Sequence, residues 1–125
     1  MKQARRNLWR VGMMALLASA SMVSQASAKG HFLTGNGLLN HCQDNSPLLQ
    51  GDCMGFTSGV SDAMADAMAS NTLNGWTACV PNQVTRGQVK DIAVQFLVKH
   101  PESRHFSASS LVANALHEAF PCPAK

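Results

Sequence analysis

No stretch of this sequence alternates apolar and polar residues as a half-buried β-strand requires. The sequence also lacks an internal repeat and a low-complexity tract. These absences argue against a sheet-based domain and against a solenoid. Apolar residues recur instead at helical spacing, so the sequence predicts an all-α fold, a small domain of about four helices.

Residues 29–125 also lack a basic patch. They hold six Lys and Arg against seven Asp and Glu, a net charge of −1, whereas the whole chain carries +3. The positive excess therefore belongs to residues 1–28. Clustered positive charge is the usual footprint of binding to nucleic acid or to anionic membranes, so we expect neither partner.

Catalytic signatures are missing as well. There is no Ser-His-Asp pattern and no phosphate-binding loop, and the histidines lack the i, i+4 spacing of helical metal ligands. His41 adjoins Cys42, but oxidation of that cysteine would remove the thiol. We therefore expect a protein that is not an enzyme and that holds no metal or cofactor. A heme or metal carrier is a weaker alternative, suggested by five histidines and by three methionines after residue 28.

Residues 1–28 have the pattern of a signal peptide. Basic residues are followed by an apolar run from Val11 to Val23 and by Ala26-Ser27-Ala28, a small-residue cleavage site. We expect cleavage after Ala28, export to the periplasm and one domain over residues 29–125. The apolar run is shorter than the roughly 20 residues that cross a bilayer, which predicts no stable membrane insertion.

All four cysteines lie in the expected mature domain, at Cys42, Cys53, Cys79 and Cys122. An even number of cysteines in a small exported domain indicates two disulfides. A zinc site is the competing interpretation. The wide spacing, without a Cys-x-x-Cys motif, argues against zinc.

The segment between Cys79 and Cys122 predicts two helices. Thr85 and Gln88 have the spacing of a capping box, and Pro101 ends the helix that they begin, at His100. A second apolar stripe follows over residues 108–119. Helices joined by a short link are expected to run antiparallel, which brings Cys79 close to Cys122 and leaves Cys42 to pair with Cys53.

Two more helices are predicted nearer the N-terminus. A short one carries Leu38 and Leu39 and runs to about Cys42, and a longer one spans about residues 49–69. Opposite the apolar arc of the longer helix lie Gly55, Gly59, Asp62 and Asp66. The glycines lower helix propensity by about 1 kcal/mol each relative to alanine. Either another backbone packs against them, or a partner docks there. Asp62 and Asp66 are candidate partner-binding residues, and a solvated face is the alternative.

Residues 70–78 predict an irregular loop that contains Asn71, Asn74 and Trp76. Because the chain has no tyrosine, Trp76 is the natural aromatic anchor outside the helices. Tryptophan is enriched in binding hot spots, so these three residues are candidates for partner binding. Core packing of Trp76 beside a disulfide is the alternative.

With these residues in place, the chain resembles the Tai/Rap family, the immunity proteins paired with type VI secretion amidase effectors. The landmarks cover nearly all of residues 29–125 in order. They are Thr34-Gly35-Asn36 with Cys42, Cys53-x-Gly55-Phe56-x-x-Gly59-Val60-x-Asp62, Cys79-x-Pro81-x-x-Val84-Thr85-x-x-Gln88-Val89, and His100-Pro101 through Leu111-Val112 to Phe120-Pro121-Cys122.

The resemblance implies a helical, disulfide-bonded periplasmic domain, often dimeric, that blocks a secreted peptidoglycan amidase. We expect an immunity-type protein whose partner is such an amidase. The alternative is a periplasmic helical binding protein or an acid-stress chaperone without an effector. A homodimer is also expected, because Val94 and Val98 lie off the main apolar stripe of their helix.

Overall fold

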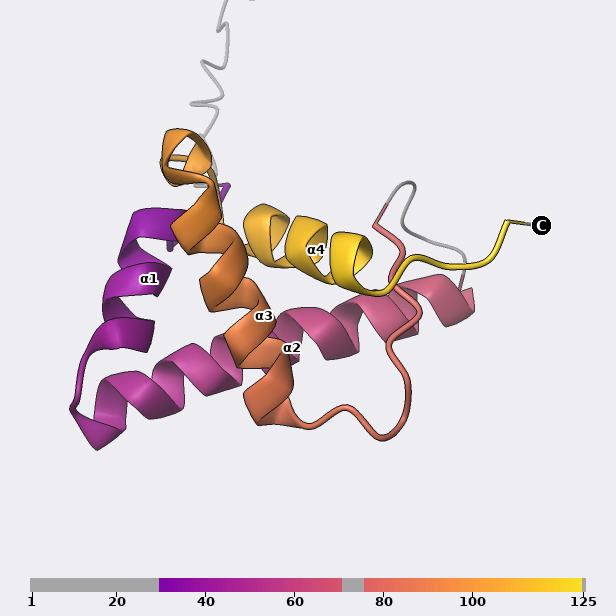
Figure 1. Cartoon of the computed structure of the whole chain (residues 1–125), viewed down its shortest axis with the longest axis horizontal. Helices are drawn as coiled ribbons and strands as arrows, with labels where there is room; N and C mark the ends of the chain where they lie inside the picture. The colour runs from indigo at the N-terminus through magenta and orange to yellow at the C-terminus, as the bar shows by residue number, and fades with distance from the viewer. Residues whose placement is uncertain (1–29, 71–75, 125) are drawn as a thin grey trace, which may run out of the picture.

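The structure is a computed structural model that describes residues 30–70 and 76–124. It contains four α-helices and one 3₁₀ turn: α1 (Gly35–Gln43), α2 (Pro47–Ser70), α3 (Arg86–Lys99), η1 (Pro101–Ser103) and α4 (Ala108–Ala119) (Figure 1). These residues form no β-strand, only an isolated bridge between Thr34 and Ser107. The all-α prediction is confirmed. The expected signal peptide lies outside the described residues.

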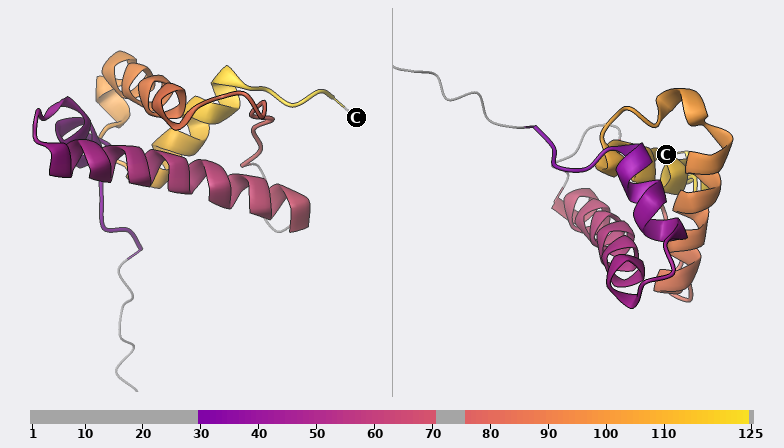
Figure 2. Two further views of the ribbon diagram at one scale, coloured as in Figure 1. Left: turned by 90° about the horizontal axis from the view of Figure 1, so that it is seen from below. Right: turned by 90° about the vertical axis from the view of Figure 1, so that its left-hand side faces the viewer.

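Helix α2 is the longest element, with 24 residues. Two views show α1, α3 and α4 on the same side of α2, so that α2 forms one edge of the molecule (Figure 2). On that side α2 buries Cys53, Thr57, Met64 and Ala67. None of the described helices covers its opposite face. The candidate site described below lies along this helix.

Polar side chains cap the N-termini of α1, α3 and α4. Thr34 Oγ1 accepts a hydrogen bond from Gly37 N–H at 3.3 Å at the start of α1, and Ser107 accepts one from Ser110 N–H at the start of α4. The capping box of α3 is present as predicted: Thr85 accepts from Gln88 N–H, and the Gln88 side chain accepts from Thr85 N–H at 2.7 Å. These bonds satisfy amide groups that a helix start leaves unpaired.

Both predicted disulfides, Cys42–Cys53 and Cys79–Cys122, are present. The antiparallel hairpin that led to the second pairing is wrong, however, because α4 crosses α3 instead of lying alongside it (Figure 1). An extended segment before α3 carries Cys79 back to the end of α4, where Cys79 N–H donates to the Phe120 carbonyl at 2.9 Å.

The turn between α3 and α4 is held by Arg104. Its guanidinium donates to the carbonyls of Leu97 at 2.5 Å and Val98 at 3.0 Å, which belong to the last turn of α3. A cation at a helix C-terminus also interacts favourably with the helix dipole. Arg104 thereby fixes the direction in which the chain leaves α3, and with it the crossing of α4.

Among the described glycines, Gly35 in the first turn of α1 has the least room for a side chain. A Cβ atom there would meet the Leu111 side chain and would lie 3.0 Å from the backbone of Arg104. Since the backbone of this turn is itself hydrogen-bonded to α1 through Asn36 N–H and the Arg104 carbonyl, it has little room to move. Only glycine fits this position without displacement.

We predict that Gly35→Ala lowers the free energy of unfolding by about 1–3 kcal/mol, the usual cost of overpacking. Gly87→Ala is the matched control, because the nearest atom to its added Cβ, Thr85 Oγ1, is 3.8 Å away. Urea unfolding of both variants is the measurement. Equal midpoints for the two variants would contradict the close approach.

A candidate partner-binding groove on helix α2

A groove of about 560 Å³ opens along α2. Its walls are apolar and come from three parts of the chain: Phe56, Val60 and Met64 on α2, Trp76 in the segment that follows, and Ser109 at the start of α4. Ligand-binding clefts in proteins usually measure about 300–1,000 Å³, so the groove is large enough to receive a side chain or a short segment of a partner.

Three glycines at four-residue spacing, Gly51, Gly55 and Gly59, lie along the groove. A Cβ atom at any of them would meet no described atom within 4 Å. The expectation that another part of the chain packs against Gly55 and Gly59 is therefore wrong within the described residues. Their cost in helix propensity, about 1 kcal/mol each, has no compensating contact in this part of the chain.

Trp76 packs against the core and also lines the groove. Its side chain is partly buried. The segment that carries it is held at two points: the Thr77 carbonyl bonds to His117 Nδ1 at 2.5 Å, and Cys79 is bridged to Cys122. The groove thus has one wall fixed by a disulfide. Asn71 and Asn74 lie outside the described residues.

Helix α2 carries three aspartates and no lysine or arginine. Asp52 lines the groove, and Asp62 and Asp66 are exposed on the outer side of the same helix. Asp62 also borders a second hollow, between α2 and Arg86 at the start of α3. The three groups give this edge of the molecule a negative charge without a neighbouring base on the helix.

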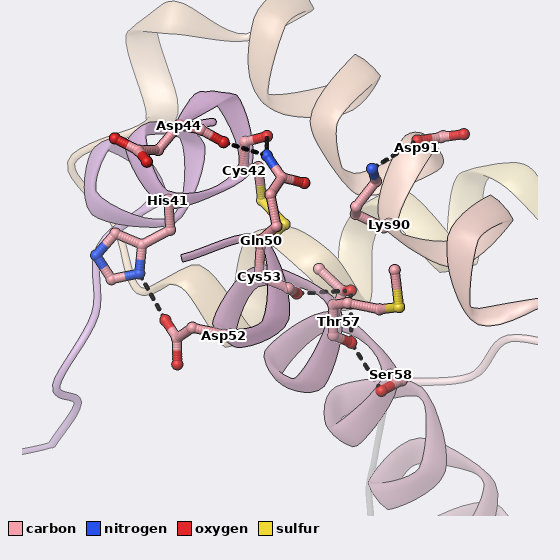
Figure 3. The surroundings of a disulfide bond; sticks show 11 residues. His41, Cys42, Asp44, Gln50, Asp52, Cys53, Thr57, Ser58, Lys90 and Asp91 are labelled. Atoms are coloured by element: carbon pink, nitrogen blue, oxygen red, sulfur yellow. Dashed lines mark hydrogen bonds and ion pairs between the residues drawn. A yellow bond between two sulfur atoms is a disulfide. The ribbon is translucent and has the colours of Figure 1, made fainter. Parts of the chain in front are cut away.

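The Cys42–Cys53 disulfide fastens α1 to α2 next to Asp52, which lines the groove (Figure 3). Beside it, His41 Nδ1 lies 2.6 Å from Asp52 Oδ2, and the Gln50 amide donates to the carbonyls of Cys42 and Asp44. A hydrogen bond from Ser46 N–H lowers the pKa of Asp44, which is also close to His41. These contacts hold the Asp52 end of the groove in place.

Two of the other histidines, His100 and His117, make hydrogen-bonding contacts. His117 bonds to the Thr77 carbonyl, and His100 lies 3.1 Å from Glu102, whose pKa is lowered by a backbone hydrogen bond and by His100. All four cysteines are oxidised, so none offers a thiol nucleophile. Within residues 30–70 and 76–124, no three His, Cys, Asp or Glu side chains are placed to hold a metal, and no helix is long and apolar enough to span a membrane.

Sequence reasoning identified parts of this site and missed others. Of the residues that line the groove it singled out Trp76 and two of the glycines, but it assigned the apolar residues of α2 wholly to the core; its candidates Asp62 and Asp66 lie outside the lining. It also missed Gly51, although the same four-residue spacing extends to it. The contribution of Ser109 depends on the crossing of α4 over α2, which no local pattern indicates.

We predict that Gly55→Ala and Gly59→Ala each raise the free energy of unfolding of the isolated protein by up to about 1 kcal/mol, because alanine favours the helix and its methyl group enters open space. Thermal or urea unfolding measures this change. A loss of stability in either variant would show that an unseen contact occupies the groove.

Comparison with known proteins finds a family match. The family described as Rap1a immunity proteins matches the chain over residues 34–122. This range includes all four helices, all four cysteines and every described residue that lines the groove. No curated protein and no solved structure matches.

Proposed function

Because the chain belongs to the Rap1a immunity protein family, we propose that it protects the cell that produces it by binding and inhibiting a secreted effector. The observation that carries this proposal is the family match over the whole helical domain. The groove on α2 gives the proposal a candidate surface, since it is largely apolar, has one charged residue in its lining, Asp52, and is built on a cross-linked scaffold. Such a surface suits a protein partner.

We propose further that the effector is a peptidoglycan amidase delivered by a type VI secretion system. The ordered landmarks from Thr34 to Cys122 support this finer assignment through their resemblance to the Tai/Rap proteins. We propose that the protein itself is exported to the periplasm and that residues 1–28 are removed as a signal peptide. Its two disulfides agree with that compartment, because disulfides persist where conditions are oxidising.

An inhibitor of this kind works by steric occlusion and needs no chemistry of its own. Binding costs less entropy when the contacting groups are already held in place. Trp76 meets this condition, because its segment is fixed by the His117 contact and by the Cys79–Cys122 bridge. Asn71 and Asn74 stay predicted contacts for polar groups of the amidase.

We also propose that the protein forms a homodimer. Val94 packs partly against its own core, which leaves Val98, 49% exposed, as the apolar residue of α3 that a second copy would cover. The groove lies along a different helix, α2. Dimerisation through Val98 would therefore leave the groove open to an effector.

We predict that the full chain, processed in the periplasm, binds one secreted cell-wall amidase of the same genome and inhibits its hydrolysis of peptidoglycan. Calorimetry gives the affinity, and release of cleaved peptidoglycan gives the inhibition. If none of these amidases binds, the amidase proposal is wrong. Suppressed aggregation of many unrelated proteins at low pH would instead favour the chaperone alternative.

We predict that Trp76→Ala weakens binding to that amidase at least tenfold, as loss of an aromatic hot spot does. Phe106→Ala is the matched control: Phe106 is 56% exposed and lies outside the groove. Circular dichroism separates folding from binding. Unchanged affinity in a folded variant removes Trp76 from the contact surface, and loss of folding assigns Trp76 to the core.

We predict a dimer at micromolar concentration in sedimentation velocity, and its dissociation by Val98→Asp, which places a charge in the proposed apolar contact. Gln95→Asp, exposed one turn earlier on α3, tests whether any added charge has this effect. Monomer alone across the micromolar range would show that the chain does not dimerise.

A further inference from the structure

We propose that the groove on α2 is the docking site for a protein segment that places an apolar side chain between Trp76 and α2 and basic residues against the aspartates of α2. This inference deepens the proposed function, on which it rests, by assigning the chemistry of the effector's contact surface. The partner would present at least one arginine or lysine beside a large apolar residue.

The shape of the groove defines the apolar part of this partner. Phe56, Val60 and Met64 line one side, and Trp76 lines the other. On the same helix the glycines present bare backbone, since no described atom outside the neighbouring helix backbone lies within 4 Å of the Cβ position of Gly55 or Gly59. A bare helix surface lets a partner approach more closely than side chains would allow, as small residues do at helix–helix contacts.

Charge defines the rest of the partner. Residues 30–85 contain four aspartates and no lysine or arginine, and three of the aspartates are on α2. The last turn of α2 has no basic residue to balance the negative end of its helix dipole. His41 Nδ1 lies 2.6 Å from Asp52 Oδ2, while Asp62 and Asp66 have no Lys, Arg or His within 4 Å among the described residues. Only Asp52 lines the groove itself, but exposed aspartates on the same helix attract basic partners and repel acidic ones.

The same charges exclude a second copy of α2 as the occupant. Two antiparallel copies centred between Gly55 and Gly59 would use the glycine spacing best. Asp52 lies three residues before Gly55, and Asp62 lies three residues after Gly59. The symmetry would therefore set Asp52 opposite Asp62 of the second copy, and like charges face to face disfavour that pairing. A basic partner meets no such penalty.

The first test uses the amidase that binds the unaltered chain. Gly59→Leu fills the groove and should lower affinity at least tenfold. Asn114→Leu, which adds the same side chain to an exposed position of α4, should leave affinity unchanged. Both variants are checked by urea unfolding. Wild-type affinity in a folded Gly59→Leu variant would overturn the proposal.

The second test addresses charge. The double variant Asp62→Lys with Asp66→Lys should lower affinity at least tenfold and weaken its dependence on salt. Glu118→Lys on α4 is an exposed control outside the groove and should change affinity less than twofold. Asp52 is left intact, because its substitution would also break the contact with His41. Equal effects of the double variant and the control would show that the aspartates of α2 do not contribute to binding, and would overturn this part of the proposal.

A third measurement does not require an amidase. The full chain is titrated with a synthetic peptide that has a phenylalanine flanked by arginines, and with its glutamate-flanked twin, while amide shifts are followed by NMR. The arginine peptide should move the Gly55 and Gly59 amides, and its twin should not. If no amidase binds but this preference holds, the amidase proposal fails and the groove chemistry stands. If neither peptide, or both equally, moves these amides, the groove proposal is wrong.

Discussion

Burial of one face of α2 is the interaction on which the arrangement of the other helices depends. Cys53, Thr57, Met64 and Ala67 lie on this face, and α1, α3 and α4 all pack on its side (Figure 2). Thr57 is the buried polar residue among them, and its hydroxyl donates to the Cys53 carbonyl at 2.9 Å, so that its burial leaves no unpaired donor. With the core gathered on one side, the opposite face of α2 is left to carry polar residues and glycine.

The two disulfides stabilise this arrangement in different ways. Cys42–Cys53 closes a short loop, with a separation of 11 residues, and joins adjacent helices beside the groove. Cys79–Cys122 closes a separation of 43 residues and joins the segment after Trp76 to the end of α4. In the chain-entropy model these loops are worth about 3 and about 4 kcal/mol. The longer loop thus contributes more, and it also fixes the wall that carries Trp76.

Local sequence signals predicted the helices correctly. They did not predict how α4 is oriented relative to α3, because that orientation depends on contacts between residues farther apart. The capping box at Thr85 and the proline at Pro101 are written within a few residues, so the bounds of α3 followed from the sequence. The crossing of α4 did not, because it depends on how Arg104 bonds to the end of α3. The disulfide pairing was right although the hairpin behind it was wrong, since an extended segment supplies the reach that an antiparallel α3 was expected to give.

The groove was only half visible in the sequence for a related reason. Glycine spacing predicted a close approach to α2, but a pattern in one helix cannot show whether the expected neighbour belongs to the same chain. The structure decides this for the described residues, because the space at Gly55 and Gly59 is open. Natural proteins retain destabilising residues where function needs them and stability above the folding threshold allows it. Three glycines in one helix, with no internal contact in the described residues to offset them, fit that condition. The two disulfides stabilise the domain and so offset the stability that the glycines of α2 cost.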